Sequence, residues 1–331
     1  MKFVALISGG KDSFYSIMES IRNGHELLAC AHLSPRHQKN LDERGEGEGA
    51  EQEEEESYMY QTAASEAIPT LVEECLGVPL ILRQCVGRSK NTSLVYDHDN
   101  DDGEDGSSSS SENKNSEKQS NVIEDEVEDL YELLIEVKSR FPSVEGISSG
   151  AILSTYQRTR IESVCSRLNL TPLGYLWRSA TQRDLLECML KDGIDAVLVK
   201  VASPPGLLPQ KHLNKTLGQL FYGGVFDRLK ERFDFHICGE GGEYETLVLD
   251  CPLFKKRLVL SEVEIIETDD GVGILQVINC CAVEKDGNTP WDTRGDLLHK
   301  RLHNHDDKPH ESDEAVVKEE VTTSISREES Q

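Results

Sequence analysis

The sequence predicts an α/β protein: a doubly wound, mostly parallel sheet followed by a smaller C-terminal α+β domain. Short apolar runs alternate along the chain with longer segments whose apolar residues recur at helical spacing. The first run ends in two glycines and leads directly into such a segment, which is the order of a strand, a phosphate-binding loop and a helix. Sheets of this class bind their ligands at the carboxyl ends of their strands.

The opening segment, residues 2–21, is expected to contain the binding centre. The apolar run 3–7 is typical of a buried parallel strand, and apolar residues return at helical spacing from Phe14 to Ile21. Between them, adjacent glycines allow a sharp turn, and the N–H groups that open a helix attract an anion. An incidental corner between strand and helix is the alternative, and the loop lacks the GxxxxGK of a Walker A loop. The loop residues are Ser8, Gly9, Gly10, Lys11, Asp12 and Ser13.

The remaining elements of the sheet follow in chain order. We expect strands at residues 26–33, 78–85 and 144–148, and helices at 61–76 and 127–141. A further helix is expected to open near Tyr156. The alternation of strand and helix places Tyr156 directly after a strand end, on the ligand edge of the sheet.

Charge is distributed unevenly along the chain. The formal net charge is −26, and the acidic segments 42–56, 97–129 and 303–331 carry nearly all of it. The rest of the chain is close to neutral, which argues against a basic nucleic-acid surface. We expect disordered acidic inserts at about 37–56 and 97–123 and a disordered acidic tail at 285–331, because such a composition buries too little apolar surface to offset ordering. A regulatory role for these segments is the alternative.

Hydrophobic runs and cysteines restrict the class of protein further. No run of eighteen apolar residues occurs, so no transmembrane helix is expected. The predicted phosphate-binding strand begins at residue 2, so we expect no cleaved signal peptide and a cytoplasmic location. The nine cysteines include no CxxC pair and lie in apolar segments, which is typical of buried small hydrophobic residues rather than zinc ligands or disulfides.

Three stretches of the sequence resemble one group of enzymes. The loop SGGKDS, Ser8 to Ser13, resembles the PP-loop of the N-type ATP pyrophosphatases. Residues 150–162 with Leu176-Trp177, and the block GEGGEYET at 239–246 with 250–254, resemble the diphthine–ammonia ligases, or diphthamide synthetases. The resemblance covers residues 1 to about 263 apart from the inserts. It implies a Rossmann-like, adenine nucleotide alpha hydrolase-like ATP-binding domain at 1–180 and a substrate domain at 181–284.

The resemblance also implies an activity and its reactants. It implies amidation of the diphthine carboxylate of elongation factor 2 by ammonia, with ATP and Mg²⁺ as cofactors. The reaction would pass through an acyl-adenylate and release AMP and pyrophosphate. The implied partners are diphthine-modified elongation factor 2 and ammonium, without direct binding to nucleic acid or membrane. Longer eukaryotic members carry RidA-like domains after the ligase region, and nothing after Val283 resembles one.

Roles for individual residues follow from the same resemblance. Lys11, Asp12, Glu243 and Glu245 are expected to be catalytic, and Asp12 is also a possible magnesium ligand. The nucleotide is expected to contact Ser8, Gly9, Gly10, Lys11, Asp12, Ser13 and Arg158. The substrate is expected to contact Tyr156, Arg160, Trp177, Glu240, Gly241, Gly242 and Tyr244.

Several of these residues have more than one reading. Arg158 and Arg160 stand at i,i+2 and cannot both face one ligand along a helix, so either can be an ordinary solvated residue. The clustered carboxylates of block 239–246 repel one another unless a cation lies among them, either magnesium or the trimethylammonium group of diphthine. Tyr244 could supply an aromatic face to that group. Lys211, His212 and Lys215 could contact phosphate or face water.

Two other classes of function remain as alternatives. A tRNA-thiolating PP-loop enzyme would need a basic surface and usually a pair of reactive or metal-bound cysteines, and neither is present in the sequence. A non-catalytic nucleotide sensor would need the phosphate loop but not the acidic block.

Overall fold

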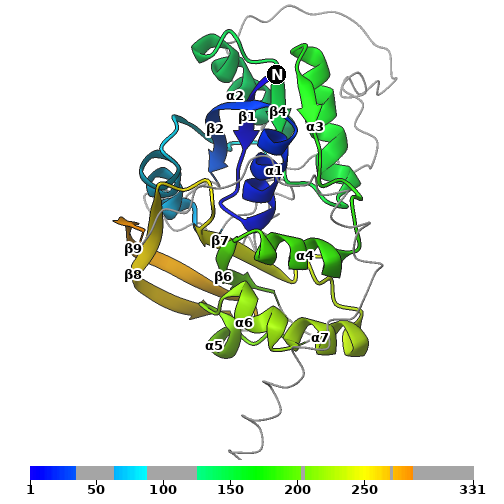
Figure 1. Cartoon of the computed structure of the whole chain (residues 1–331), viewed down its shortest axis with the longest axis vertical. Helices are drawn as coiled ribbons and strands as arrows, with labels where there is room; N and C mark the ends of the chain where they lie inside the picture. The colour runs from blue at the N-terminus through cyan, green and yellow to red at the C-terminus, as the bar shows by residue number, and fades with distance from the viewer. Residues whose placement is uncertain (35–62, 88–124, 203–205, 269–270, 286–331) are drawn as a thin grey trace, which may run out of the picture. The chain divides into compact units, whose positions relative to one another are not determined.

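The computed structural model describes residues 1–34, 63–87, 125–202, 206–268 and 271–285, all within one compact unit, Met1–Gly295 (Figure 1). The predicted acidic inserts lie outside the described residues, as does the predicted tail apart from Lys285. The predicted domain boundary near residue 180 falls inside the compact unit and stays a prediction.

The first sheet has five parallel strands and confirms the predicted α/β fold class. Its strands are β1 (Lys2–Leu6), β2 (Glu26–Ser34), β3 (Leu80–Gln84), β4 (Gly146–Ser148) and β5 (Thr171–Leu173), in the order β3-β2-β1-β4-β5. Ala5 of β1 pairs with Cys30 on one side and with Ser148 on the other. The strand order therefore reverses between β1 and β4, and such a reversal opens a crevice at the carboxyl ends of the strands.

Helices cover both faces of this sheet. On one face, α2 (Glu126–Arg140) and α3 (Thr155–Arg167) share a buried apolar cluster with the strands, which includes Val4, Leu130 and Val164. On the other face, α1 (Lys11–Arg22) contacts β1, β2 and β4 and also strand β7 of the second sheet, so it lies between the two sheets (Figure 1).

The helix predicted at 61–76 is irregular in its described part. The described part consists of a 3₁₀ turn η2 (Ser65–Ala67) and a π-helix η3 (Thr70–Leu76). Pro69 precedes η3 and has no N–H to donate, which breaks the helical hydrogen-bond ladder at that point. Gly77 ends η3 in the left-handed region with φ 74°, and its N–H donates to the carbonyl of Val72.

The second sheet confirms the smaller α+β part. It is antiparallel in the order β7 (Tyr244–Asp250), β6 (Asp195–Val201), β9 (Gly273–Glu284) and β8 (Lys256–Glu267). Helices α4 (Gln182–Lys191), α5 (Pro209–His212), α6 (Leu217–Tyr222) and α7 (Val225–Phe233) accompany it in the lower part of Figure 1. After Asp195 at its start, the β6 run is apolar except for Lys200, and its residues 196–201 are buried.

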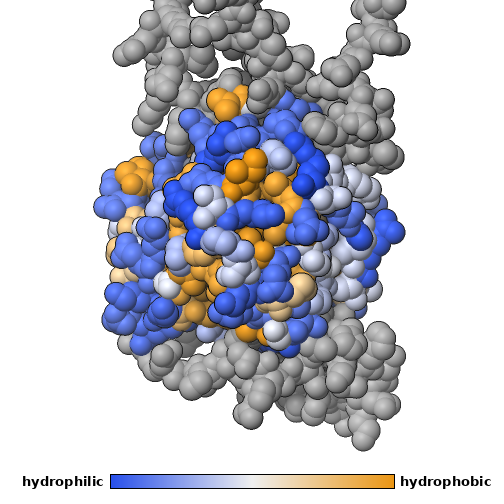
Figure 2. Space-filling view, turned by 90° about the horizontal axis from the view of Figure 1, so that it is seen from above, coloured by the Kyte–Doolittle hydropathy of each residue, from blue (hydrophilic) through white to orange (hydrophobic). Residues whose placement is uncertain are grey.

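Cysteine burial follows the sequence prediction with one clear exception. All nine cysteines are free thiols, and seven of them are buried. Cys281 is exposed and Cys280 is half-buried, because they stand on β9 of the β8–β9 hairpin, where side chains alternate between two faces. Within the described ranges no helix is long and apolar enough to cross a membrane. The face shown in Figure 2 is largely hydrophilic, with apolar side chains in small groups.

Candidate active site

A cavity of about 690 Å³ lies where the first sheet meets the loop before β7. Its walls include residues 6–8 and 10–13 after β1, 31–33 at the end of β2, and 149–151 after β4. Across from them stand residues 238–242 and 244–246 together with Lys200 of β6. The cavity therefore forms at the reversal of strand order and combines segments more than two hundred residues apart in the sequence.

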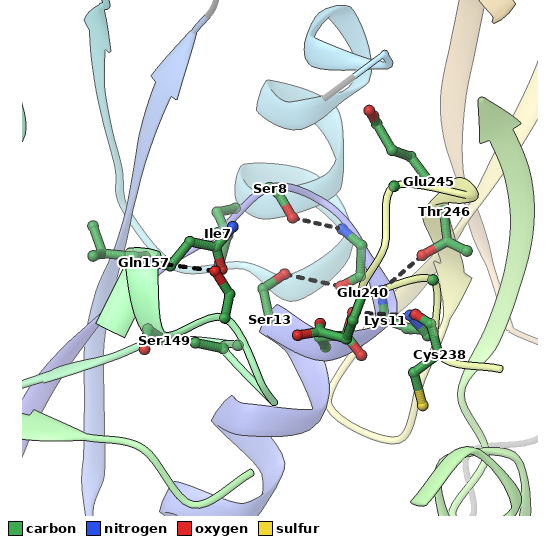
Figure 3. Close-up of a pocket in the computed structure, with 18 of the residues that line it drawn as sticks. Ile7, Ser8, Lys11, Ser13, Ser149, Gln157, Cys238, Glu240, Glu245 and Thr246 are labelled. Atoms are coloured by element: carbon green, nitrogen blue, oxygen red, sulfur yellow. Dashed lines mark hydrogen bonds and ion pairs between the residues drawn. The ribbon is translucent and has the colours of Figure 1, made fainter. Parts of the chain in front are cut away.

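Two serines of the phosphate loop make hydrogen bonds that stabilise its conformation. Gly9 has φ 85°, a conformation that glycine adopts without strain. The Gly10 N–H donates to Ser8 Oγ at 3.4 Å, and Ser13 Oγ donates to the Gly10 carbonyl at 2.8 Å (Figure 3). Helix α1 begins at Lys11 with Gly10 as its N-cap, which has no side chain of its own to cap the helix; the Lys11 N–H donates to Thr246 Oγ1 at 3.1 Å. Such a helix start attracts an anion because of its N–H groups and its dipole.

Gly150, in the turn after β4, packs directly against this loop. A Cβ at Gly150 would lie 2.7 Å from the Ser13 nitrogen and 2.8 Å from the Asp12 carbonyl carbon. Only a residue without a side chain fits there, so the β4 turn and the first turn of α1 approach more closely than other residues permit.

Lys11 connects the phosphate loop to the Gly–Glu block, residues 239–246, through Cys238 directly before it. Its Nζ donates to the Cys238 carbonyl at 2.6 Å and to Asp12 Oδ2 at 2.9 Å, and the side chain is almost completely buried. Burial lowers the pKa of the Lys11 ammonium, but nearby charges, chiefly that of Asp12, outweigh burial and raise it. Lys11 therefore keeps its positive charge inside the cavity.

Asp12 and Glu240 bring two carboxylates to the same cavity. Asp12 Oδ1 is buried and has no hydrogen-bond partner among the described residues, and burial raises the pKa of Asp12. Glu240 Oε2 accepts from the Leu153 N–H at 2.9 Å. Burial also raises the pKa of Glu240, and the charge of Asp12 raises it further. Two crowded carboxylates, one with an unpartnered buried oxygen, fit a divalent cation.

No group of three or more histidine, cysteine, aspartate or glutamate side chains suited to a metal ion occurs in the part of the chain that the structure describes. Magnesium usually takes only one or two protein carboxylates and completes its shell with water and phosphate oxygens. The pair Asp12 and Glu240 therefore fits magnesium held together with a nucleotide better than a metal held by protein ligands alone.

Glu243 holds the shape of the block rather than lining the cavity. Its Oε1 accepts from the His236 N–H and its Oε2 from the Gly241 N–H, both at 2.9 Å. Gly239 and Gly242 beside it have positive φ values of 77° and 82°. The carboxylate thus ties together a turn that needs two glycines.

Tyr244 is a buried member of an aromatic stack. Its ring lies 5.3 Å from Phe226 and 6.0 Å from Phe235, nearly parallel to both, and its hydroxyl donates to the Ile237 carbonyl at 2.5 Å. Tyr244 borders the cavity, but only 3% of the residue is exposed. The Lys11 Nζ lies 5.2 Å from its ring centroid.

Glu245 pairs with a lysine that sequence analysis missed. Its Oε1 lies 3.3 Å from Lys200 Nζ, and its Oε2 accepts from the Ala63 N–H at 2.9 Å. Figure 3 shows the Glu245 side chain pointing away from Lys11 and Ser13. Lys200 lines the cavity. The feature of the sequence that could have identified it is a single charged residue inside the apolar run 196–201.

The site residues predicted on α3 differ in where the structure places them. Tyr156 lines the cavity, and its hydroxyl donates to Glu126 Oε1 at 3.1 Å. Arg160 is fully buried, with its guanidinium 3.3 Å from the Tyr156 ring centroid. Arg158 pairs with Glu162 at 2.6 Å and covers the ring of Trp177 at 4.6 Å. Arg158, Arg160 and Trp177 do not line the cavity, so their binding roles stay predictions.

The three basic residues near 211 also lie outside the cavity wall. Lys211 and Lys215 are exposed. His212 is buried, and its Nδ1 accepts from the Leu208 N–H at 2.7 Å, which gives this ring a local structural contact. Of the two alternatives for these residues, phosphate contact has no support in the geometry of this cavity, and exposure to water fits Lys211 and Lys215.

Comparisons with known proteins identify relatives over most of the chain. The family model described as diphthamide synthase N-terminal domain matches residues 114–172, and the model described as diphthamide synthase C-terminal domain matches residues 189–282. A Rattus norvegicus protein named diphthine–ammonia ligase is 42% identical over 88% of this chain and 96% of its own length. A Homo sapiens protein of the same name is 45% identical over 80% of this chain and 85% of its own. A Schizosaccharomyces pombe protein of that name is 39% identical over 90% of this chain but 42% of its own length.

Proposed function

The chain belongs to the diphthamide synthase family of diphthine–ammonia ligases, and on this premise we propose that it amidates the diphthine carboxylate of elongation factor 2. The reaction would use ATP and ammonia and take place in the cytoplasm, where the elongation factor acts. One observation carries the proposal: the phosphate loop and the Gly–Glu block line the same cavity and are joined through Lys11 and Cys238.

The chemistry explains why ATP is needed. A carboxylate accepts ammonia poorly, because its leaving group would be oxide. We propose that a diphthine carboxylate oxygen bonds to the α-phosphorus of ATP, that the bond between the α and β phosphates breaks, and that pyrophosphate leaves. The ammonia nitrogen then bonds to the activated carbonyl carbon and gives up a proton, and AMP leaves with the bonding pair.

The phosphate loop supplies the groups that hold the leaving pyrophosphate. Gly9, Gly10 and Ser13 would hold the β and γ phosphates, with Ser8 beside them, because this loop leads directly into the N-terminus of helix α1. Lys11 would neutralise charge that develops on the phosphates. Its buried ammonium supports this role, because charge stabilisation is strongest where water is excluded.

Magnesium is the second proposed cofactor. Asp12, through Oδ1, and Glu240 would hold it, and the unpartnered Asp12 oxygen supports this assignment. A bound magnesium ion would neutralise negative charge on the phosphates during transfer. Asp12 would keep Oδ2 on the Lys11 ammonium and so orient both groups toward the same side of the loop.

The substrate cation sets a different requirement. A trimethylammonium group cannot donate a hydrogen bond, so carboxylates or aromatic faces must recognise it. Glu240 lines the cavity and can face it, whereas both Glu245 oxygens already have partners in Lys200 and Ala63; Tyr156 supplies an aromatic ring there. Tyr244 lies in a stack with Phe226 and Phe235, which favours a supporting role in which it holds the block in place.

The test uses the full chain with ATP, ammonium and elongation factor 2 that carries diphthine. Conversion of the modified histidine from carboxylate to carboxamide, measured by mass spectrometry, is the expected result. AMP and pyrophosphate should form in step with the amide. Formation of ADP and phosphate in step with the amide would contradict the acyl-adenylate, and no amide at all would contradict the proposed activity.

A further inference from the structure

His32 is a buried polar residue in the cavity wall to which the proposed reaction assigns no role. It lies in β2 between Ala31 and Leu33, and only 2% of it is exposed. Its Nδ1 lies 2.7 Å from the carbonyl oxygen of Ile7, the residue that precedes the phosphate loop. His32 therefore connects the carboxyl ends of β1 and β2 at the edge where the cavity opens.

The contact with Ile7 fixes which ring nitrogen of His32 carries the proton. A backbone carbonyl only accepts hydrogen bonds, so Nδ1 must be the donor. Burial lowers the pKa of the His32 imidazole, against a smaller raising effect of the Ile7 carbonyl, and this keeps the ring neutral. In a neutral ring with a proton on Nδ1, Nε2 has no proton and can only accept a hydrogen bond.

This acceptor has no partner among the described residues. His32 Nε2 is buried and makes no hydrogen bond to them. A buried polar atom without a partner carries a free-energy cost that a ligand with a matching donor removes. The ligand atom that reaches Nε2 must therefore be an N–H or an O–H.

The surroundings of His32 favour a flat, mostly apolar ligand group. Leu6, Ala31, Leu33, Ala151 and Ile161 line the cavity together with it. The charged groups of the cavity belong to other segments, the phosphate loop, the Gly–Glu block and Lys200. Figure 3 shows the loop leading from Ile7 through Ser8 toward Lys11. The loop that would bind a nucleotide phosphate therefore follows directly after the Ile7 carbonyl that His32 contacts. A purine base suits an apolar wall with one polar atom, whereas a ribose presents hydroxyl groups on several sides.

We propose that His32 Nε2 accepts a hydrogen bond from the 6-amino group of adenine and that this contact selects ATP over GTP. The inference rests on the proposed function, because it takes ATP to be the ligand of the cavity. Guanine carries a carbonyl oxygen at the position of the amino group. Two acceptors would then face each other, and neither would have a proton to share.

The test measures nucleotide affinities of the full chain by calorimetry, without the elongation factor. The ligands are ATP, GTP, purine riboside triphosphate, which lacks the 6-amino group, and 2′-deoxy-ATP. For the unmodified chain we expect purine riboside triphosphate to bind roughly three- to tenfold more weakly than ATP, the effect of one hydrogen bond. GTP should bind more weakly still.

Two variants assign this difference to His32. His32→Phe keeps a flat ring without the acceptor, and ATP and purine riboside triphosphate should bind it equally well. His32→Gln keeps an acceptor oxygen and should recover part of the preference for ATP. Because each result is a ratio within one variant, a general loss of affinity or stability cancels. Thermal unfolding followed by circular dichroism shows whether each variant is folded, and the comparison of ligands on the unmodified chain needs no variant.

The outcomes separate this inference from the proposed function. If His32→Phe still prefers ATP over purine riboside triphosphate, the inference is wrong while ATP binding stands. If the variant instead loses a preference for ATP over 2′-deoxy-ATP, the donor is a ribose hydroxyl and the adenine assignment is overturned. An unmodified chain that binds all four nucleotides equally overturns nucleotide selection by His32, and one that binds none of them overturns the proposed function as well.

Discussion

The ammonium of Lys11 donates a 2.6 Å hydrogen bond to the carbonyl of Cys238, a residue 227 positions away in the sequence. Two further hydrogen bonds join the phosphate loop to strand β7, a boundary that we call the seam: the Lys11 N–H donates to Thr246 Oγ1, and the Val248 N–H donates to the Gly9 carbonyl. The phosphate loop is thus attached to the second sheet by both backbone and side chain. Changes at this seam should affect chemistry and stability together.

Lys11→Met tests the charge at the seam. We expect the rate of AMP formation in a single turnover to fall on the order of a hundredfold or more, the effect of removing one group that stabilises developing charge. Thermal unfolding should also occur at lower temperature, because Asp12 would lose its ion-pair partner in a mostly buried setting. Lys211→Met is the matched control, since Lys211 is exposed and outside the cavity. Equal rates for the two variants would remove Lys11 from the mechanism.

Glu240→Gln distinguishes the two cations that the cavity can hold. If Glu240 supports magnesium, we expect the magnesium concentration needed for half-maximal AMP formation to rise by roughly tenfold or more, with partial rescue at high magnesium. If Glu240 instead faces the trimethylammonium group, ATP binding and magnesium dependence stay normal while the Michaelis constant for the diphthine protein rises. If the variant has the same magnesium dependence and the same Michaelis constant for the diphthine protein as the unmodified chain, Glu240 binds neither cation.

Glu243→Ala tests whether this residue acts through the shape of the block. The substitution leaves the N–H groups of His236 and Gly241 without their acceptor, so we expect a loss of about 1–3 kcal/mol in the free energy of unfolding, measured in urea. Glu284→Ala is the control, because Glu284 makes an exposed ion pair with Lys256, and its loss should change stability little. Unchanged stability with lost activity would return Glu243 to its predicted catalytic role.

Sequence pattern was sufficient for strands β1 to β4 of the first sheet and for the phosphate loop, because each depends on local signals, whereas no residue range was predicted for the short β5. The apolar run before Ser8 and the two glycines after it specify a strand and a turn without reference to the rest of the chain. Tyr244 shows where this reasoning stops. Its motif indicated a site, but its partners Phe226 and Phe235 become neighbours only through folding. The same holds for Arg160: its position in a helical segment, next to Thr159, does not reveal that its side chain is fully buried.

Deletion of residues 99–121 tests the acidic insert, which lies outside the described residues. The Val86 and Gly87 N–H groups both donate to Asp129 Oδ2 at 2.7 Å, so the chain leaves β3 beside the helix to which it returns. Residues 88–98 and 122–124 then remain to join two nearby points, and loop length carries only a slowly growing entropic cost. We expect nearly unchanged turnover. A folded deletion variant without turnover would show that the acidic segment contributes to function, with docking of the elongation factor as the first role to examine.

Gly150→Ala tests the close approach between the β4 turn and the phosphate loop. The added Cβ would meet backbone atoms of Ser13 and Asp12 at 2.7–2.8 Å, and backbone cannot move aside as a flexible side chain can. We therefore expect the loop to shift, with amidation slower on the order of a hundredfold, because small displacements of reacting groups have large effects on rate. Gly218→Ala is the matched control: its Cβ would have no neighbour closer than 4.0 Å, and alanine suits helix α6. If the two variants retain equal rates and equal ATP affinities, the phosphate loop tolerates displacement, and the close packing at Gly150 serves the fold alone.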